Sequence, residues 1–281
     1  MSSNQRIFVD AIRRYCRARG IACEVKSQGW LIIMQHGERR HLAFGYDIGL
    51  NSAMAHRIAN DKSATAEVLT YSGIACIPHT LFLSPKLGKH APLGDAREAM
   101  LVLLHAHPQG LVTKPNEGTS GRFVFKVASE AELDRATAEV FSSHLSLAIS
   151  PFVEIEEEVR VILLDGDVRV VYSKERISDW RHNLDFGARP ILLEQGEARE
   201  ACIAMAVQAA NAIGIRFASI DIARVAGSLK VLEINSGVMM EVLGKHHPDL
   251  AYATYAAALD KVFETIPLGG KRRGWPGQAR P

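Results

Sequence analysis

The chain has 281 residues, with 33 basic and 31 acidic side chains that leave a formal net charge of +2. Nucleic-acid-binding proteins usually carry a concentrated basic surface, and this near-neutral charge does not indicate one. We therefore expect no nucleic-acid partner. No apolar run approaches the roughly 20 residues that span a bilayer, and the first residues lack the apolar core of an export signal. We therefore expect no membrane partner, a cytoplasmic location, and reduced thiols at Cys16, Cys23, Cys76 and Cys202.

The first 90 residues are expected to form a small α/β region. Apolar side chains recur at helical spacing over residues 5–19, and Gly20 ends that pattern. Another helix is predicted over residues 52–71, with Gly73 as the residue that closes it. Short apolar runs predict strands over residues 21–25, 30–34, 41–44 and 74–78.

Two α+β units are expected to follow, over residues 91–150 and 151–265. Capping-box spacings at Asp95 and Ser129 predict the starts of two helices in the first unit. Its strands are predicted over residues 110–115, 122–127 and 147–153. The second unit combines strand pairs near residues 158–176 and 217–235 with helices over 197–213 and 249–264. The tail over residues 266–281, rich in Gly, Pro, Lys and Arg, is expected to be disordered.

The last strand pair carries two acids and an amide at matching positions. A turn centred on Gly227 would pair residues whose numbers sum to 454, which places Asp221 opposite Glu233. The same register sets Ile220 against Ile234 and Ile222 against Leu232. Because strand side chains alternate, one face of the hairpin becomes aliphatic. The other face carries Ser219, Asp221, Glu233 and Asn235.

Carboxylates opposed on antiparallel strands lie about 4.5–5.5 Å apart at Cβ and repel each other. A divalent cation removes this conflict, and carboxylates with an amide oxygen are hard ligands that suit Mg²⁺. The pairing therefore favours a metal site formed by Asp221, Glu233 and Asn235. The alternative is a solvated hairpin face that happens to carry two acids.

A second motif gives this hairpin a context. The segment Val112-Thr113-Lys114-Pro115-Asn116-Glu117-Gly118-Thr119-Ser120-Gly121-Arg122 resembles the signature of the ATP-grasp superfamily. Together with Asp221 and Glu233-x-Asn235, it is similar to the branch of ribosomal-S6 glutamate ligase, glutathione synthetase and cyanophycin synthetase. The resemblance covers about residues 50–262. It implies an α+β ATP-grasp fold, two subdomains that clamp ATP, preceded by the small α/β domain.

The resemblance also assigns nucleotide contacts. Lysines at a strand end and glycines with free backbone N–H groups suit phosphate oxygens, although an ordinary polar turn or surface lysine would look similar. Residues 148–153 match the hinge that meets adenine, with Val153 N–H as the donor because Pro151 has none. The implied ATP-binding residues are Lys62, Lys114, Glu117, Gly118, Thr119, Ser120, Gly121, Ser150, Pro151, Phe152, Val153 and Glu158.

Arginines suit a reaction that passes through an acyl phosphate and an anionic tetrahedral adduct, because a guanidinium stabilises negative charge without titrating. The resemblance implies catalytic roles for Arg160, Arg176, Arg181 and Asn183, and two Mg²⁺ ions, for which Mn²⁺ can substitute. The implied reaction forms a carbon–nitrogen bond between a small-molecule carboxylate and an amine, through an acyl phosphate, on an amino acid, peptide or peptide-like metabolite.

Two other functions remain open: a phosphotransferase on the same fold, and a nucleotide-binding module without catalysis. The acceptor side is expected near residues 236–241, where Met239 and Met240 could form an apolar wall or belong to the core. A homo-oligomer, dimer or tetramer, is also left open.

Overall fold

The computed structural model describes residues 6–90, 96–118, 122–175 and 189–265. Its helices are α1 (Ile7–Ala18), α2 (Ala53–Asn60), α3 (Lys62–Tyr71), α4 (Ala96–Ala106), α5 (Glu130–Ser143), α6 (Glu197–Ile213), α7 (Glu241–His246) and α8 (Pro248–Thr265). Its strands are β1 (Ala22–Lys26), β2 (Leu31–His36), β3 (Arg39–Phe44), β4 (Thr80–Leu83), β5 (Leu111–Pro115), β6 (Phe125–Val127), β7 (Ser146–Pro151), β8 (Glu157–Leu164), β9 (Asp167–Lys174), β10 (Pro190–Leu192), β11 (Phe217–Val225) and β12 (Ser228–Asn235).

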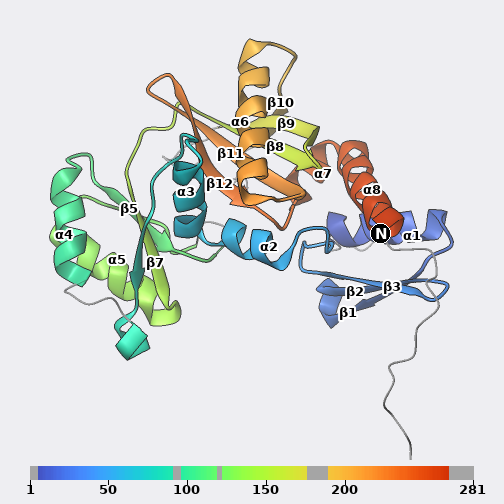
Figure 1. Cartoon of the computed structure of the whole chain (residues 1–281), viewed down its shortest axis with the longest axis horizontal. Helices are drawn as coiled ribbons and strands as arrows, with labels where there is room; N and C mark the ends of the chain where they lie inside the picture. The colour runs from blue at the N-terminus through green and yellow to red at the C-terminus, as the bar shows by residue number, and fades with distance from the viewer. Residues whose placement is uncertain (1–5, 91–95, 119–121, 176–188, 266–281) are drawn as a thin grey trace, which may run out of the picture.

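These strands form three antiparallel sheets. The sheet orders are β1-β2-β3, β10-β9-β8-β11-β12 and β4-β7-β5-β6. Figure 1 shows the five-stranded sheet in the middle, with the four-stranded sheet on one side and the three-stranded sheet on the other. The four-stranded sheet takes β4 from before residue 90, and the expected boundary between the first two regions at that residue remains a prediction.

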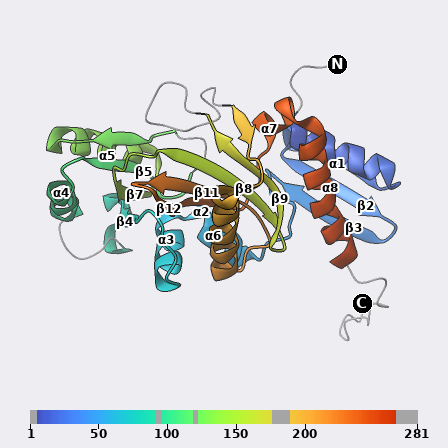
Figure 2. The ribbon, with the colours of Figure 1, turned by 90° about the horizontal axis from the view of Figure 1, so that it is seen from above.

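One face of the five-stranded sheet is aliphatic and is covered by α6 (Figures 1 and 2). Alternate residues of β8 and β11, such as Val161 and Ile220, are fully buried there against Ala206 and Ala209 of the helix. Small alanine side chains let the helix approach the sheet closely. Helices α2 and α3 contribute Ala59 and other side chains to the same core.

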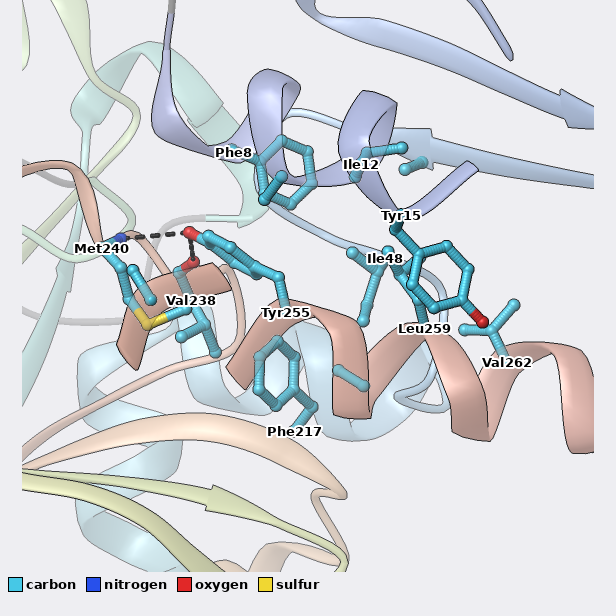
Figure 3. Packing of buried hydrophobic residues seen from close by; sticks show 14 of the residues in the cluster. Phe8, Ile12, Tyr15, Ile48, Phe217, Val238, Met240, Tyr255, Leu259 and Val262 are labelled. Carbon is cyan, nitrogen blue, oxygen red and sulfur yellow. Dashed lines mark hydrogen bonds between the residues drawn. The ribbon is translucent and has the colours of Figure 1, made fainter. Parts of the chain in front are cut away.

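The opposite face of this sheet is divided. At one end, Ile162 and Phe217 join a core built with α1, α8 and the three-stranded sheet. Figure 3 shows Phe217 below Tyr255 of α8, with Phe8 of α1 above them. The buried hydroxyl of Tyr255 donates to the Val238 carbonyl (2.8 Å) and accepts from the Met240 N–H (3.1 Å). These bonds fix the chain that follows β12.

Several expectations need correction. The helix expected over residues 52–71 is two helices, because Asp61 takes an extended conformation and its carboxylate caps α3 by accepting from the Ala64 N–H (2.8 Å). The strand expected over 74–78 is one parallel bridge, between Cys76 and Val231. Strand β10 and helix α7 were not expected. The tail over residues 266–281, which was expected to be disordered, lies outside the described residues.

The hairpin of β11 and β12 has the expected register only near its open end. Asp221 lies opposite Glu233 and Ser219 opposite Asn235, as expected, but Ile222 lies opposite Val231. The turn consists of Ala226 and Gly227, both with positive φ (48° and 73°), which is the two-residue turn that antiparallel hairpins favour. A bulge next to Ile222 then absorbs one residue of β12. Leu232 is therefore displaced from the predicted pairing.

No helix in the described part of the chain is long and apolar enough to cross a membrane. All four cysteines are free thiols.

We predict that Gly110 is required by both conformation and space. Its φ is +93°, and a Cβ there would lie 2.5 Å from the Val127 carbonyl oxygen. Gly166, with φ +85° and nothing within 4 Å of a Cβ, is the matched control. Gly166→Ala should lower the free energy of unfolding by about 1 kcal/mol, from backbone strain alone. Gly110→Ala should lower it by about 2–4 kcal/mol, because steric overlap adds to that strain.

Urea unfolding of the two variants measures the difference. Equal losses would mean that the Val127 carbonyl moves aside easily, which would contradict a space requirement at Gly110.

Candidate functional site

A cavity of about 670 Å³ lies where the three sheets meet, and many of the predicted site residues line it. Those residues come from the start of α3, the strands β5 and β7, and the charged end of the five-stranded sheet. They are Lys62, Lys114, Gly118, Ser150, Pro151, Phe152, Val153, Glu158, Arg160, Asp221, Glu233 and Asn235.

The remaining predicted residues divide into two groups. Glu117 is exposed and forms an isolated bridge with Asp61, and it does not line the cavity. The others lie outside the described residues: Thr119, Ser120, Gly121, Arg176, Arg181 and Asn183.

The floor of the cavity is a row of side chains across four adjacent strands. The sheet registers pair Tyr172 with Arg160, Arg160 with Asp221, and Asp221 with Glu233. Antiparallel partners project on the same side of a sheet, so the whole row faces the cavity. All four residues line it.

Asp221 is almost completely buried, with 2 % of its surface exposed. Arg160 donates a hydrogen bond to each carboxylate oxygen (2.7 and 2.6 Å), and the Lys174 ammonium lies 3.1 Å from one of these oxygens. Burial by itself would raise the pKa of Asp221, but the Arg160 and Lys174 charges outweigh it and lower this pKa to about 2. The carboxylate is therefore ionised at neutral pH.

Lys174 was not predicted as a site residue. Its buried ammonium also forms an ion pair with Glu158, and burial raises the pKa of Glu158 despite this partner. The alternation along β9 could have identified it, because Lys174 lies two residues after Tyr172 and therefore projects on the same side. Asp221, Glu158, Arg160 and Lys174 form one buried network of two acids and two bases.

Lys62 is anchored to the end of β5. Its backbone N–H donates to the Asn116 carbonyl (3.2 Å), and the buried Asn116 side chain accepts from the Ser63 N–H (3.0 Å). The Lys62 ammonium donates to the Gly118 carbonyl (2.9 Å) and lies 3.6 Å from Glu233. Asn116, the first residue of the predicted loop, thus links the start of α3, which carries Lys62, to the end of β5, which carries Lys114.

The segment between β7 and β8 passes close to Gly110. The Phe152 N–H donates to the Gly110 carbonyl (2.9 Å), while Pro151 has no N–H to give. The ring of Phe152 lies under the Lys126 ammonium, 3.4 Å from it. This part of the cavity wall is therefore fixed to β5 and β6.

A further wall of the cavity was missed entirely by sequence reasoning. It comes from the N-terminal unit and includes Arg6, Trp30, Phe44, Tyr46, Asp47 and His56. No local motif marks these residues, because their shared position depends on how the three-stranded sheet packs against the rest. Beyond β12, Met239 also lines the cavity, whereas Met240 is buried in the core.

The expected metal ligands meet the chemical requirements of a hard cation. No group of three or more His, Cys, Asp or Glu side chains suited to a metal occurs among the described residues. Asp221, Glu233 and Asn235 instead offer two carboxylates and an amide. The buried Asn235 Nδ2 has no hydrogen-bond partner in the described structure, so no contact of this nitrogen fixes the orientation of the amide.

Known proteins share this architecture. The D-alanine–D-alanine ligase of Bacillus anthracis, solved in complex with ATP, superposes with a TM-score of 0.59 at 22% identity, over 76% of this chain and 68% of that one. At this identity the likeness shows the fold, which is the ATP-grasp fold expected from the sequence.

Residues 95–252, more than half of the chain, match the family of RimK-like ATP-grasp domains, and the chain belongs to that family. A probable α-L-glutamate ligase of Pasteurella multocida is 28% identical over 200 residues, which are 70% of this chain and 59% of that protein. The tetrahydromethanopterin:α-L-glutamate ligase of Methanocaldococcus jannaschii is 26% identical over 132 residues, 44% of each chain. This chain thus spans less than two thirds of either relative.

We predict that Lys114 destabilises the folded protein through its burial. Burial, followed by the Lys62 charge, lowers the pKa of Lys114 from 10.5 to about 8, despite the nearby Glu233 carboxylate. The folded state therefore loses this proton at a lower pH than the unfolded state. Its destabilisation is complete below pH 8, declines as the pH rises, and disappears above about 10.5.

Lys114→Met should therefore raise the free energy of unfolding by about 3 kcal/mol at pH 7, since each pKa unit corresponds to about 1.4 kcal/mol. The gain should shrink steadily between pH 8 and 10.5. Urea unfolding across this range measures it, with exposed Lys245→Met as the control. A gain that does not change with pH would show that Lys114 keeps an ordinary pKa.

Proposed function

We propose that the protein is an ATP-dependent ligase that joins a carboxylate to an amine through an acyl phosphate. The observation that carries this proposal is the cavity floor, where Asp221 and Glu233 lie opposed among four cationic side chains. Those cations are Lys62, Lys114, Arg160 and Lys174. Such a mixture suits a triphosphate with its metal, which brings both negative and positive charge to the site. The family membership supports the same reading.

The nucleotide would lie between the four-stranded and the five-stranded sheet, which would be the two ATP-grasp subdomains. Lys62 and Lys114 would donate to its phosphate oxygens as point charges. The adenine edge would meet the segment after β7, where Val153 is the residue left to offer an N–H, because Phe152 already donates to Gly110. Glu158 would approach the ribose from the floor of the cavity.

Asp221, Glu233 and Asn235 would hold Mg²⁺. When bound, it would neutralise phosphate charge and make the γ-phosphorus more electrophilic. Arg160 and Lys174 keep Asp221 ionised at neutral pH, which is the state that a ligand carboxylate needs.

In the first step, an oxygen of the substrate carboxylate would attack the γ-phosphorus and the bond to the β-phosphate oxygen would break, giving an acyl phosphate and ADP. In the second, an amine would attack the carbonyl carbon, expel phosphate and lose a proton. Arg160 lies beside Asp221 in the floor, where its guanidinium would stabilise the anionic tetrahedral adduct. The names of the relatives make an L-amino acid the first substrate to test.

Trapping with hydroxylamine tests the proposed intermediate. The protein is incubated with ATP, Mg²⁺ and hydroxylamine, and the twenty amino acids are supplied singly and in pairs. We expect ADP release to be accompanied by a hydroxamate, because hydroxylamine replaces the amine in the second step. ADP release without hydroxamate would favour transfer of phosphate to a hydroxyl group, and nucleotide binding with no release at all would favour a non-catalytic module.

We predict that Glu233→Gln reduces ADP release by at least about a hundredfold, the usual effect of removing one charge-stabilising group. The substitution keeps the shape of the side chain, and Glu233 is only partly buried, so the fold should be retained. Asp165→Asn is the control, because Asp165 pairs with Arg216 at the β8–β9 turn and does not line the cavity. Unchanged release in Glu233→Gln would remove this carboxylate from the proposed site.

A further inference from the structure

The cavity continues beyond the part that the proposed nucleotide and metal would occupy. Its outer wall is formed by the N-terminal unit, where Arg6, Trp30, Phe44 and Tyr46 lie together. Figure 1 shows the three-stranded sheet and α1 on the opposite side of the five-stranded sheet from β5. This wall therefore faces the reacting centre from the side away from Lys114.

Arg6 brings a positive charge to this wall. Its guanidinium carbon lies 4.8 Å from the ring centroids of both Trp30 and Tyr46. Its guanidinium donates to the backbone carbonyls of Gly29 and Gly45, and the Tyr46 hydroxyl interacts with both Arg6 and Glu241. Among the described residues, no carboxylate lies within 4.0 Å of it, whereas Arg160, Lys174 and Lys62 each have an acidic partner.

The two acids near this wall are already engaged. Asp47 accepts from the Gly49 N–H (2.7 Å) and lies 3.2 Å from His56. The Glu241 carboxylate accepts from the Ile7 N–H (2.7 Å) and the Phe8 N–H (3.4 Å), and so caps the first turn of α1. Arg6 thus remains a cation whose donors are only partly used. A guanidinium has five N–H donors, and its geometry matches a carboxylate.

Beside Arg6, the wall is apolar and open to solvent. Trp30 is 50 % exposed and Phe44 is 64 % exposed, and their ring centroids are 6.4 Å apart. An apolar group of a ligand that packs on these exposed rings would stabilise the complex, because apolar surface would be removed from water. The wall therefore offers a charged contact and an apolar contact side by side.

Packed residues connect the Arg6 wall to the proposed metal site. A Cβ on Gly237 would lie 3.5 Å from the Tyr46 Cβ, so these two residues pack together. Gly237 follows the proposed metal ligand Asn235 by two residues, and Arg6, Tyr46, Gly237 and Asn235 all line the same cavity.

We propose that Arg6 binds the free carboxylate of the amine substrate, an amino acid or short peptide whose apolar side chain packs on Trp30 and Phe44. This inference rests on the proposed ligase function, in which that substrate attacks the acyl phosphate. The carboxylate anchored at Arg6 leaves the amine of the same molecule to point toward the phosphates.

Calorimetry without turnover tests the inference. The probes are L-leucine, L-phenylalanine and L-glutamate and the carboxamide of each, titrated into the protein with a non-hydrolysable ATP analogue and Mg²⁺. At least one of the two apolar amino acids should bind, at least about tenfold more tightly than its carboxamide and more tightly than glutamate, the scale of one charged hydrogen bond. Equal binding of acid and carboxamide, or no binding of the acids, would overturn the inference.

Variants separate the two contacts. Arg6→Met should abolish the preference for the acid, and Arg6→Lys should retain part of it. Phe44→Ala, at an exposed position, should weaken leucine and phenylalanine while keeping their preference over the carboxamides. The control is Arg19→Met, which removes an arginine stacked on Tyr15 (4.1 Å) outside the cavity. A preference that survives in Arg6→Met would overturn the assignment of Arg6.

The two proposals can fail separately. Acid-selective binding without ADP release would remove the ligase reaction and leave the binding site at Arg6 intact. ADP release together with an unchanged preference in Arg6→Met would leave the ligase and remove this subsite.

Discussion

The site depends on the burial of one ionised carboxylate. Asp221 can remain charged with only 2 % of its surface exposed because Arg160 and Lys174 surround it. Both cations project from strands of the same sheet, so the antiparallel registers determine whether the three groups meet. Removing either cation would leave a buried charge without compensation, which is among the most destabilising changes in a protein interior.

The same sheet face serves both stability and function. Ile162 and Phe217 lie in the core with α1 and α8. On the same two strands and the same face, two residues away, Arg160 and Ser219 line the cavity. The core therefore holds the charged row rigidly. It also fixes the N-terminal unit, through Tyr255 and Phe8 (ring centroids 5.2 Å apart), at the distance where Arg6 and Trp30 can close the cavity.

Sequence reasoning succeeded where the physics is local. Alternation along two strands was sufficient to set Asp221 opposite Glu233, and the expected α6 matches its observed bounds, Glu197–Ile213. It failed at Leu232, because a two-residue turn and a compensating bulge give the same pairing near the open end as the turn that was assumed. Lys174 was overlooked although its strand alternation was visible. Arg6 and Trp30 could not have been found, since only tertiary packing brings them to the cavity.

In the proposed function, the hairpin register brings Asp221, Glu233 and Asn235 to one cation beside a nucleotide. Electron paramagnetic resonance of Mn²⁺ in the presence of a non-hydrolysable ATP analogue measures this binding without any substrate. We expect the wild-type protein to bind Mn²⁺ and the affinity of Asn235→Ala for Mn²⁺ to be at least about tenfold lower, the scale of one lost ligand. Asp165→Asn should bind as the wild type does. Equal Mn²⁺ binding in Asn235→Ala and the wild type would contradict the account.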